Sequence, residues 1–384
     1  MLGMYVDSRA VKEVLFMEYV AFILLRKSLV DAKKTLAGFK EKVEPEMEAF
    51  FERVISENEK SDKNIASAMR HARKITMSGG KRARAAFMYY GYLAAGGEDK
   101  KEMLKVSISI ELIHAFLLMH DDIIDCDELR HGVRTMHAQY ADVARRNFKG
   151  KDAEHFGNSI AIIMGDILSA LGNQVLFESK FDPKVVVSAL RKMQGIIACT
   201  AIGEAQDVYI ENRGDADEAE ILRMYENKTA KYTIEGPLHL GAILAGADDG
   251  FIQSLSRYAI PAGMAFQIQD DILGVFEKSK KIGKPVGSDV RQGKRTILVS
   301  RAFANADSKQ KKVLERCLGN DRLTDSDLDE FKKVIIETGA LEYARGLAEK
   351  MIIESKREIA KVPMRKEAKE FLVGIADYML NREF

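Results

Sequence analysis

Apolar residues recur at three- and four-residue spacing along most of the chain, which is the period of an amphipathic α-helix. Two of the clearest runs are Val106, Ile110, Ile113 and Leu117, and then Ile160, Ile163, Ile167 and Leu171. Alternating strand patterns bounded by Asn-Gly or Asp-Gly turns do not occur in the sequence. Several segments are apolar on more than one face, as helices inside a bundle are. We therefore predict an all-α fold.

Glycines and charged clusters separate these helical segments, for example at 78–80, 132–135 and 279–293, where we expect loops. No shift in composition marks a domain boundary along the main part of the chain. We predict one helical domain over residues 35–384, preceded by an extra helical segment at 1–34.

The extra segment contains the apolar stretch 14–25, which is interrupted by Glu18 and is shorter than the roughly 20 residues of a membrane span. No signal-peptide pattern accompanies it, so we expect a cytoplasmic protein. We interpret it as a helix packed on the body or on a partner subunit. A membrane-surface helix is the alternative.

Charge and cysteine content exclude several classes of function. The 384 residues include 59 basic and 58 acidic ones, a formal net charge of +1, which gives no global attraction to nucleic acid. Cys126, Cys199 and Cys317 are far apart and fit neither zinc spacing nor a disulfide framework. Any anionic ligand must therefore be held by local clusters.

The first such cluster is acidic and closes an apolar helix. Asp121 and Asp125 are four residues apart, which places them on one helix face, and Asp122 lies between them. Carboxylates so placed repel unless a cation sits between them, and magnesium suits such oxygen ligands. A solvated acidic helix end is the alternative for this motif taken alone.

A second pair, Asp270 and Asp271, again follows an apolar helix, 149 positions beyond the first. Two acidic doublets can face each other across a bundle, as metal sites on facing helices do. Magnesium together with a diphosphate would balance so negative a cavity.

Basic residues complete the pattern. The sequence Gly-Gly-Lys-Arg-Ala-Arg at 79–84 puts three cations beside a glycine turn, where backbone amides can approach a phosphate. Arg130, Lys228 and Lys284 add further cations. The spacing is not that of a P-loop, and each basic motif alone could be an exposed turn.

The order of these motifs resembles the trans-prenyl diphosphate synthase family. The chain has Gly-Gly-Lys-Arg-x-Arg, Glu-Leu-Ile-His, Asp-Asp-x-x-Asp, Lys-Thr, Phe-Gln-x-Gln-Asp-Asp, Gly-Lys-Pro-x-Gly-Ser-Asp and Gly-Lys-Arg-Thr in turn. The resemblance runs from about residue 35 to the C-terminus. It implies an isoprenoid synthase-like bundle of long antiparallel helices around a central active-site cavity.

The resemblance also implies a role for each matching residue. Three magnesium ions would be held by Asp121, Asp125 and Asp270, supported by Asp122 and Asp271. Substrate diphosphates would be bound by basic and imidazole side chains: Arg130, Lys228, Lys284 and Lys294, with Lys81, Arg84, His114 and position 131 on the isopentenyl side. The developing carbocation would be steadied by Thr229, Tyr232 and Gln267, with Lys228 nearby.

The implied reaction joins isopentenyl diphosphate to dimethylallyl, geranyl or farnesyl diphosphate. Phe116 and Leu117 match the positions that form the floor of the chain-length pocket, and the pair is similar to the archaeal type that makes the C20 product geranylgeranyl diphosphate. Phe116 lies about 140° around an ideal helix from Asp121, so ordinary core packing is the alternative.

Three residues depart from the family pattern. His131 stands in place of a second arginine, Glu204 in place of a glutamine, and Gly274 in place of the last aspartate. A neutral histidine cannot replace a guanidinium, so we expect weak isopentenyl diphosphate binding that improves below about pH 6.5. The rivals are a class I terpene cyclase and a non-catalytic subunit of a heteromeric synthase. We expect a homodimer with weak peripheral membrane contact.

Overall fold

The computed structural model describes residues 8–149, 152–276 and 287–380, with side chains of the first helix described from residue 32 onward. The elements of the first half are α1 (Ser8–Glu59), α2 (Lys63–Met77), α3 (Ala83–Ala94), α4 (Lys100–Val106), α5 (Ile108–Ile124), β1 (Leu129–Arg130), β2 (Val133–Arg134), α6 (Met136–Asn147) and α7 (Ala153–Phe177). Those of the second half are α8 (Pro183–Arg213), α9 (Glu218–Tyr225), η1 (Glu226–Glu235), α10 (Gly236–Leu244), α11 (Asp249–Phe276), α12 (Ser288–Gln292), α13 (Ile297–Asn305), α14 (Ser308–Cys317), α15 (Asp325–Glu337), α16 (Ala340–Lys361) and α17 (Lys366–Leu380).

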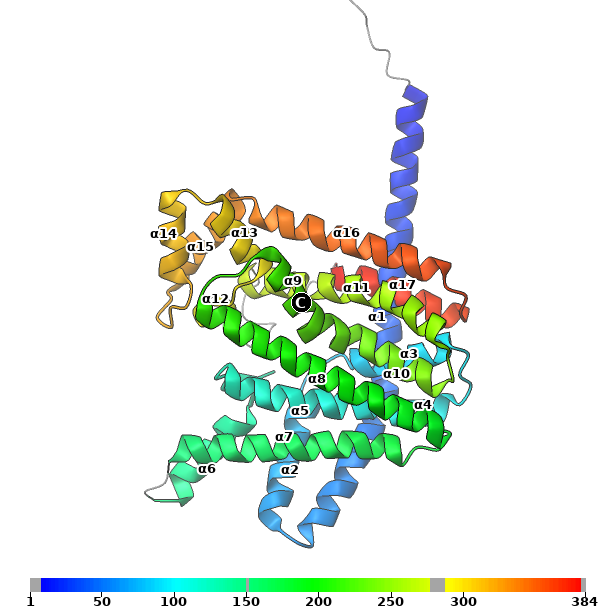
Figure 1. Ribbon diagram of the computed structural model, residues 1–384, viewed down its shortest axis with the longest axis vertical. Helices are drawn as coiled ribbons and strands as arrows, with labels where there is room; N and C mark the ends of the chain where they lie inside the picture. Colours follow the sequence, from blue (N-terminus) through cyan, green and yellow to red (C-terminus); the bar gives the residue numbers. More distant parts are fainter. Residues whose placement is uncertain (1–7, 150–151, 277–286, 381–384) are drawn as a thin grey trace, which may run out of the picture.

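The long helices form a layered bundle, which confirms the predicted all-α class. Helices α5, α7, α8, α11 and α16 run roughly along one another, and α1 crosses the layers (Figure 1). Helix α5 packs on α7, α11 packs on α16, and the short helices α3 and α10 pack together in the interior. Nearly every residue of α3 and α10 is buried, so these two helices form the centre of the core.

Helix boundaries follow local capping chemistry. Asp62, Asp99 and Asp152 precede helices and accept hydrogen bonds from backbone N–H groups of the first turn. Helix α8 combines an Asp182 cap with proline at its first position, where the missing N–H costs nothing. These capping signals involve only neighbouring residues, so they can be recognised in the sequence.

Two of the segments expected to be loops contain regular secondary structure. Residues 132–135 include strand β2, which pairs antiparallel with β1 across a two-residue turn at His131 and Gly132. Both turn residues have positive φ, 49° and 77°, as a type I′ hairpin requires. The expected loop at 279–293 also contains α12. Both elements are short, and tertiary packing rather than periodicity specifies them.

Helix α1 continues without a break across residues 34 and 35, and its first part extends beyond the other helices (Figure 1). From residue 32 onward its apolar face is buried at Leu36, Phe39, Val43 and Met47, mainly against α17 and α2. The second part of α1 thus belongs to the body. A separate role for residues 1–34 stays a prediction.

Helices α7 and α8, and the segment Lys100–Ile124, are long and apolar enough by length and composition to cross a membrane. Only 33% of the apolar window is buried in α7 and in α8, against 61% in the third segment. Large side chains are correspondingly exposed on these two helices: Ile162, Ile163, Phe177, Val187, Ile202 and Tyr209. We call these six residues the α7–α8 face.

Candidate active site

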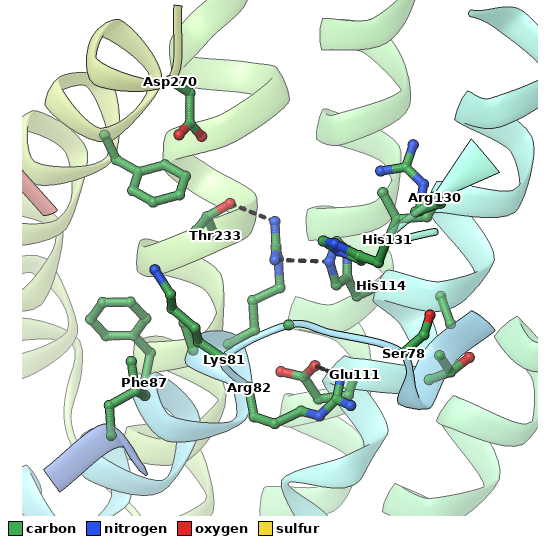
Figure 2. Close-up of a pocket in the computed structure, with 18 of the residues that line it drawn as sticks. Ser78, Lys81, Arg82, Phe87, Glu111, His114, Arg130, His131, Thr233 and Asp270 are labelled. Atoms are coloured by element: carbon green, nitrogen blue, oxygen red, sulfur yellow. Dashed lines mark hydrogen bonds and ion pairs between the residues drawn. The ribbon is translucent and has the colours of Figure 1, made fainter. Parts of the chain in front are cut away.

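Two adjoining cavities lie in the middle of the bundle. The basic cavity, about 560 Å³, is lined by Lys81, Arg82 and His131 among others, and Figure 2 shows these side chains around one hollow. The acidic cavity, about 710 Å³, is lined by Asp121 and Glu204 together with apolar residues. Six residues line both cavities: Arg84, His114, Leu118, Thr233, Phe266 and Asp270. The sequence motifs therefore converge on one double cavity.

All three carboxylates of the first acidic cluster are ion-paired, Asp121 with Arg130 at 3.5 Å, and Asp121 also lines the acidic cavity. Asp121 lines the acidic cavity, and its side chain is 23% exposed. Asp122 is buried and accepts a 2.7 Å hydrogen bond from Nε of Arg130. Burial raises the pKa of Asp122 to about 6, against the lowering effect of Arg130. Asp125 accepts a 3.0 Å bond from Lys294.

The second doublet also has one cavity-lining and one buried member. Asp270 lines both cavities, whereas Asp271 is buried and accepts hydrogen bonds from the Tyr225 hydroxyl and from Nε2 of Gln267 at 2.8 Å. Burial raises the pKa of Asp271 well above its ordinary value. Gln267 in turn accepts a 2.6 Å bond from Thr229. Asp271 thus orients Gln267, which lines the acidic cavity.

These carboxylates suit magnesium in the way that ion is usually bound. In the described ranges no group of three or more His, Cys, Asp or Glu side chains stands close enough to hold a metal ion alone. Magnesium commonly takes one or two carboxylates and completes its shell with water and substrate phosphates. Asp121 and Asp270 offer such oxygens to one cavity, and the Lys294 ammonium shows that Asp125 already attracts a cation.

The segment η1 presents the predicted polar residues on a π-helix. Lys228, Thr229 and Tyr232 lie on it, and π-helical turns occur frequently at functional sites. The segment packs closely on α8, because a Cβ at Gly203 would lie 2.3 Å from the backbone nitrogen of Lys228. Only glycine permits this approach. Periodicity did not predict the π-helix.

Lys228 forms the centre of a dense ion-pair network. Its ammonium lies 2.8 Å from Glu204 and 2.6 Å from Asp207. Burial alone would lower the pKa of Lys228, but Asp207, Asp121 and Glu204 raise it above the ordinary value. Burial raises the pKa of Glu204. The lysine therefore stays charged, with two carboxylates beside it.

Lys294 makes a second bridge over the same acidic cluster, with Asp125 at 3.0 Å, Glu211 at 3.1 Å and Asp207 at 3.4 Å. Asp207 is buried, which alone would raise its pKa, but Lys228 and Lys294 lower it. The substrate-binding prediction for Lys294 is thus placed beside the metal-binding prediction for Asp125. Lys284 lies outside the described residues.

At the junction of the cavities, Arg84, His114 and Tyr232 form a connected group. Arg84 donates to Nε2 of His114 at 3.1 Å and to Thr233 at 2.9 Å, and its guanidinium lies 4.3 Å from the centre of the Tyr232 ring. Burial and Arg84 hold the pKa of His114 well below its ordinary value. The neutral ring therefore carries its proton on Nδ1, which lies 2.6 Å from the Tyr232 hydroxyl.

The β1–β2 hairpin brings Arg130 and His131 to the basic cavity (Figure 2). The His131 ring lies against the glycine turn, since a Cβ at Gly79 would be 2.8 Å from it. Burial, then Arg130, Arg82 and Lys40, lower the pKa of His131. Protonation of His131, and the improved isopentenyl diphosphate binding expected from it, therefore needs a lower pH than an unperturbed histidine would require.

Phe116 and Leu117 both line the acidic cavity. The Phe116 ring packs edge-on against His120, with centroids 4.9 Å apart, and His120 Nε2 lies 3.1 Å from the Ile162 carbonyl oxygen. The apolar wall continues along α8 through Ile197, Ala201 and Val208. This end of the acidic cavity is shaped for a hydrocarbon chain.

Several site residues lacked a sequence signal. Arg82 is buried and pairs with Glu44 at 2.9 Å, although it looked like one of three equivalent cations. Tyr225 fixes Asp271, and Thr233 receives Arg84, through contacts between distant segments. Asp207 ends the family-like pattern Gly-Glu-x-x-Asp at 203–207, but the pattern did not indicate its two lysine partners. Only the fold reveals these partnerships.

A family model described as polyprenyl synthetase matches residues 65–335 of the chain. The chain belongs to the polyprenyl synthetase family. It is 34% identical over 310 residues to a geranylgeranyl diphosphate synthase of Saccharolobus solfataricus, across 79% of this chain and 87% of the relative. It is 32% identical over 313 residues to a geranylfarnesyl diphosphate synthase of Aeropyrum pernix, across 80% and 92%.

Solved structures agree with this polyprenyl synthetase assignment. A geranylgeranyl pyrophosphate synthase of Corynebacterium glutamicum, complexed with isoprenyl diphosphate and magnesium, matches with a TM-score of 0.86 and 29% identity. The match covers 91% of this chain and 99% of that one. The expected isoprenoid synthase-like fold is thereby confirmed.

Proposed function

We propose that this polyprenyl synthetase condenses isopentenyl diphosphate with an allylic diphosphate and releases geranylgeranyl diphosphate as its main product. The observation that carries the proposal is the double cavity. One half is lined by cations, the other by carboxylates and an apolar wall, and Asp270, Arg84 and Thr233 stand at their junction. Two diphosphate substrates can thus meet with their reacting carbons side by side.

The basic cavity receives isopentenyl diphosphate, whose diphosphate faces Lys81 and Arg84. The acidic cavity receives the allylic substrate, with its hydrocarbon along Phe116 and Leu117 and its diphosphate near Lys228. Magnesium, when bound to Asp121, Asp125 and Asp270, supplies Lewis-acid stabilisation of the leaving diphosphate. We propose three ions per site, by the family resemblance.

The chain's own residues then guide the charge. Lys228 and Arg130 stabilise the negative charge that grows on the leaving diphosphate as the allylic C–O bond breaks. Thr229, Tyr232 and Gln267 line the acidic cavity, and we assign to their oxygens the stabilisation of the carbocation. The isopentenyl double bond attacks the allylic carbocation and forms the new C–C bond, which leaves a cation on the isopentenyl unit. The carbon next to this cation loses a proton to the released pyrophosphate, and a new double bond forms.

The test incubates the purified chain with magnesium, labelled isopentenyl diphosphate and each of three primers, dimethylallyl, geranyl and farnesyl diphosphate. Elongation to C20 supports the proposal. Pyrophosphate release without elongation would identify a terpene cyclase instead. Neither elongation nor pyrophosphate release with any primer, together with co-purification of an active synthase, would identify a non-catalytic subunit.

The retained basic cavity favours a synthase over a cyclase, because a cyclase has no isopentenyl diphosphate to bind. Lys81, Arg84 and His114 all line it. The cavity-lining Asp121 and Asp270 favour an active enzyme over a non-catalytic subunit.

We propose that the enzyme is a homodimer in the cytoplasm and that a second copy covers the α7–α8 face. Exposed apolar residues gathered on two neighbouring helices are typical of a protein interface. Weak peripheral membrane contact, suited to a hydrophobic product, belongs to the same proposal. Sedimentation of the full chain without vesicles tests the dimer, and a monomer would contradict it. Sedimentation with vesicles tests the membrane contact, and a chain that does not sediment with them would contradict that.

A further inference from the structure

The cations that line the basic cavity are unevenly available to a bound anion. Arg82 is 4% exposed and lies between two carboxylates, Glu44 at 2.9 Å and Glu111 at 3.9 Å. Arg130 is held by Asp122. The charges of both arginines are therefore largely balanced within the protein before any ligand binds.

The histidine at position 131 adds little positive charge. It occupies the hairpin turn at the rim of the cavity, and its pKa is lowered by burial and by the neighbouring cations. At neutral pH its ring is uncharged and offers a single N–H donor. A diphosphate in the basic cavity thus meets less charge at this corner than a guanidinium would provide.

A cation from α1 stands at the same corner. Lys40 Nζ donates a 3.0 Å hydrogen bond to the carbonyl of Gly80, and Gly80 itself lines the cavity. Leu36, one helical turn before Lys40 and on the same face of α1, also lines it. The positive charge of Lys40 is one of those that lower the pKa of His131.

Lys40 keeps donor capacity for a ligand. Its ammonium has three N–H donors, and the contacts to Gly80 and to Glu44, which lies 3.6 Å away, account for two. The side chain is 35% exposed, so it reaches solvent as well as the loop. It differs in this from Arg82, whose partners enclose it.

We propose that Lys40 is a binding residue for the diphosphate of isopentenyl diphosphate and supplies the charge that histidine at position 131 does not. The inference rests on the proposed function and adds to the basic cavity a residue of α1, which lies before residue 65, where the match to the family model begins. It makes α1 part of the substrate site.

The test compares Lys40→Met, Lys40→Arg and the exposed control Lys42→Met with the full-length wild type. Lys40→Met should raise the KM for isopentenyl diphosphate roughly tenfold, the usual loss for a charge-assisted hydrogen bond. The kcat and the KM for the allylic substrate should change little. Lys40→Arg should restore most of the affinity, and Lys42→Met should match the wild type.

A double-variant cycle with His131→Arg isolates the compensation. In that background Lys40→Met should raise the KM only about threefold, because a guanidinium now supplies the missing charge. An equal effect in both backgrounds would overturn the compensation. An unchanged KM in Lys40→Met, or a fall in kcat without one in affinity, would overturn the binding role.

Calorimetric binding of isopentenyl diphosphate without magnesium separates this inference from the proposed function. If the wild type failed to elongate any primer, the proposed function would fall. Weaker binding of that probe by Lys40→Met than by Lys42→Met would still support Lys40, and equal binding would overturn it.

Discussion

The two aspartate doublets are built alike but are held differently. In each, the first member lines the acidic cavity and the second is buried beside it. Asp122 is held by the Arg130 guanidinium, whereas Asp271 is held by the neutral donors of Tyr225 and Gln267. Adjacent identical residues thus serve separate purposes, because a helix points neighbours about 100° apart.

The groups that support the buried members of the two doublets also differ in charge. Arg130 pairs with Asp121 and Asp122, Lys294 pairs with Asp125 of the same motif, and the charge of Lys228 interacts with Asp121, so these cations suit a diphosphate. The second doublet is supported by a hydrogen-bond chain from Tyr225 through Asp271 and Gln267 to Thr229, which orients uncharged oxygens. The leaving diphosphate would meet the cations near the first doublet, and the carbocation would meet the oxygens of Gln267 and Thr229.

The largest expected effect follows from removing a cavity-lining carboxylate. Asp121→Ala and Asp270→Ala should each lower kcat roughly 10³-fold, because each removes stabilisation of the leaving diphosphate. Thermal melting should change little, since neither side chain is fully buried. Steady-state elongation assays measure the loss, and near-normal turnover in either variant would contradict the assigned metal role.

Next in size is the stability difference between the buried members. Asp122→Asn removes the nearest counter-ion of Arg130, which keeps the more distant Asp121 at 3.5 Å and Asp127 at 3.8 Å, and should cost about 3 kcal/mol of unfolding free energy. Asp271→Asn should cost about 1–3 kcal/mol, because an amide accepts from only one of the two donors that the carboxylate now serves.

Urea unfolding of both variants, with the exposed Asp329→Asn as control, measures this order. Equal costs for Asp122→Asn and Asp271→Asn would show that the kind of partner does not matter at these positions.

The smallest effect concerns the charge balance at the first doublet. Glu204→Gln removes one of the two carboxylates that neutralise Lys228, so inorganic pyrophosphate should bind roughly threefold more tightly without magnesium. Calorimetry provides the measurement, and Glu226→Gln, whose partner is Lys231 instead, is the matched control. Unchanged or weaker binding would show that Glu204 does not restrain Lys228.

The sequence predicted the parts of the site that lie within single helices. Asp121 and Asp270 reach one cavity because each motif lies in a regular α-helix, whereas Lys228 reaches it from the π-helix η1. Helix starts can also be predicted from the sequence, because a capping residue such as Asp99 acts on a backbone N–H only three residues away.

The remaining features depend on contacts between distant segments. The burial of Arg82 needs Glu44 from α1, and the π-helix at 226–235 depends on close packing against Gly203 of α8. The His131–Gly132 turn could have been suspected from its glycine, but histidine is an uncommon first residue there. No local pattern carries such information.

The acidic cavity is proposed to hold the growing chain, and the length of the product reports on this placement. Wild type and Phe116→Ala would be incubated side by side with magnesium, labelled isopentenyl diphosphate and farnesyl diphosphate, and their products sized. We predict that the wild type stops at C20 and that Phe116→Ala, with a large side chain removed from the cavity wall, continues to C25 or beyond. The same end point for both enzymes would contradict the placement of the chain against Phe116.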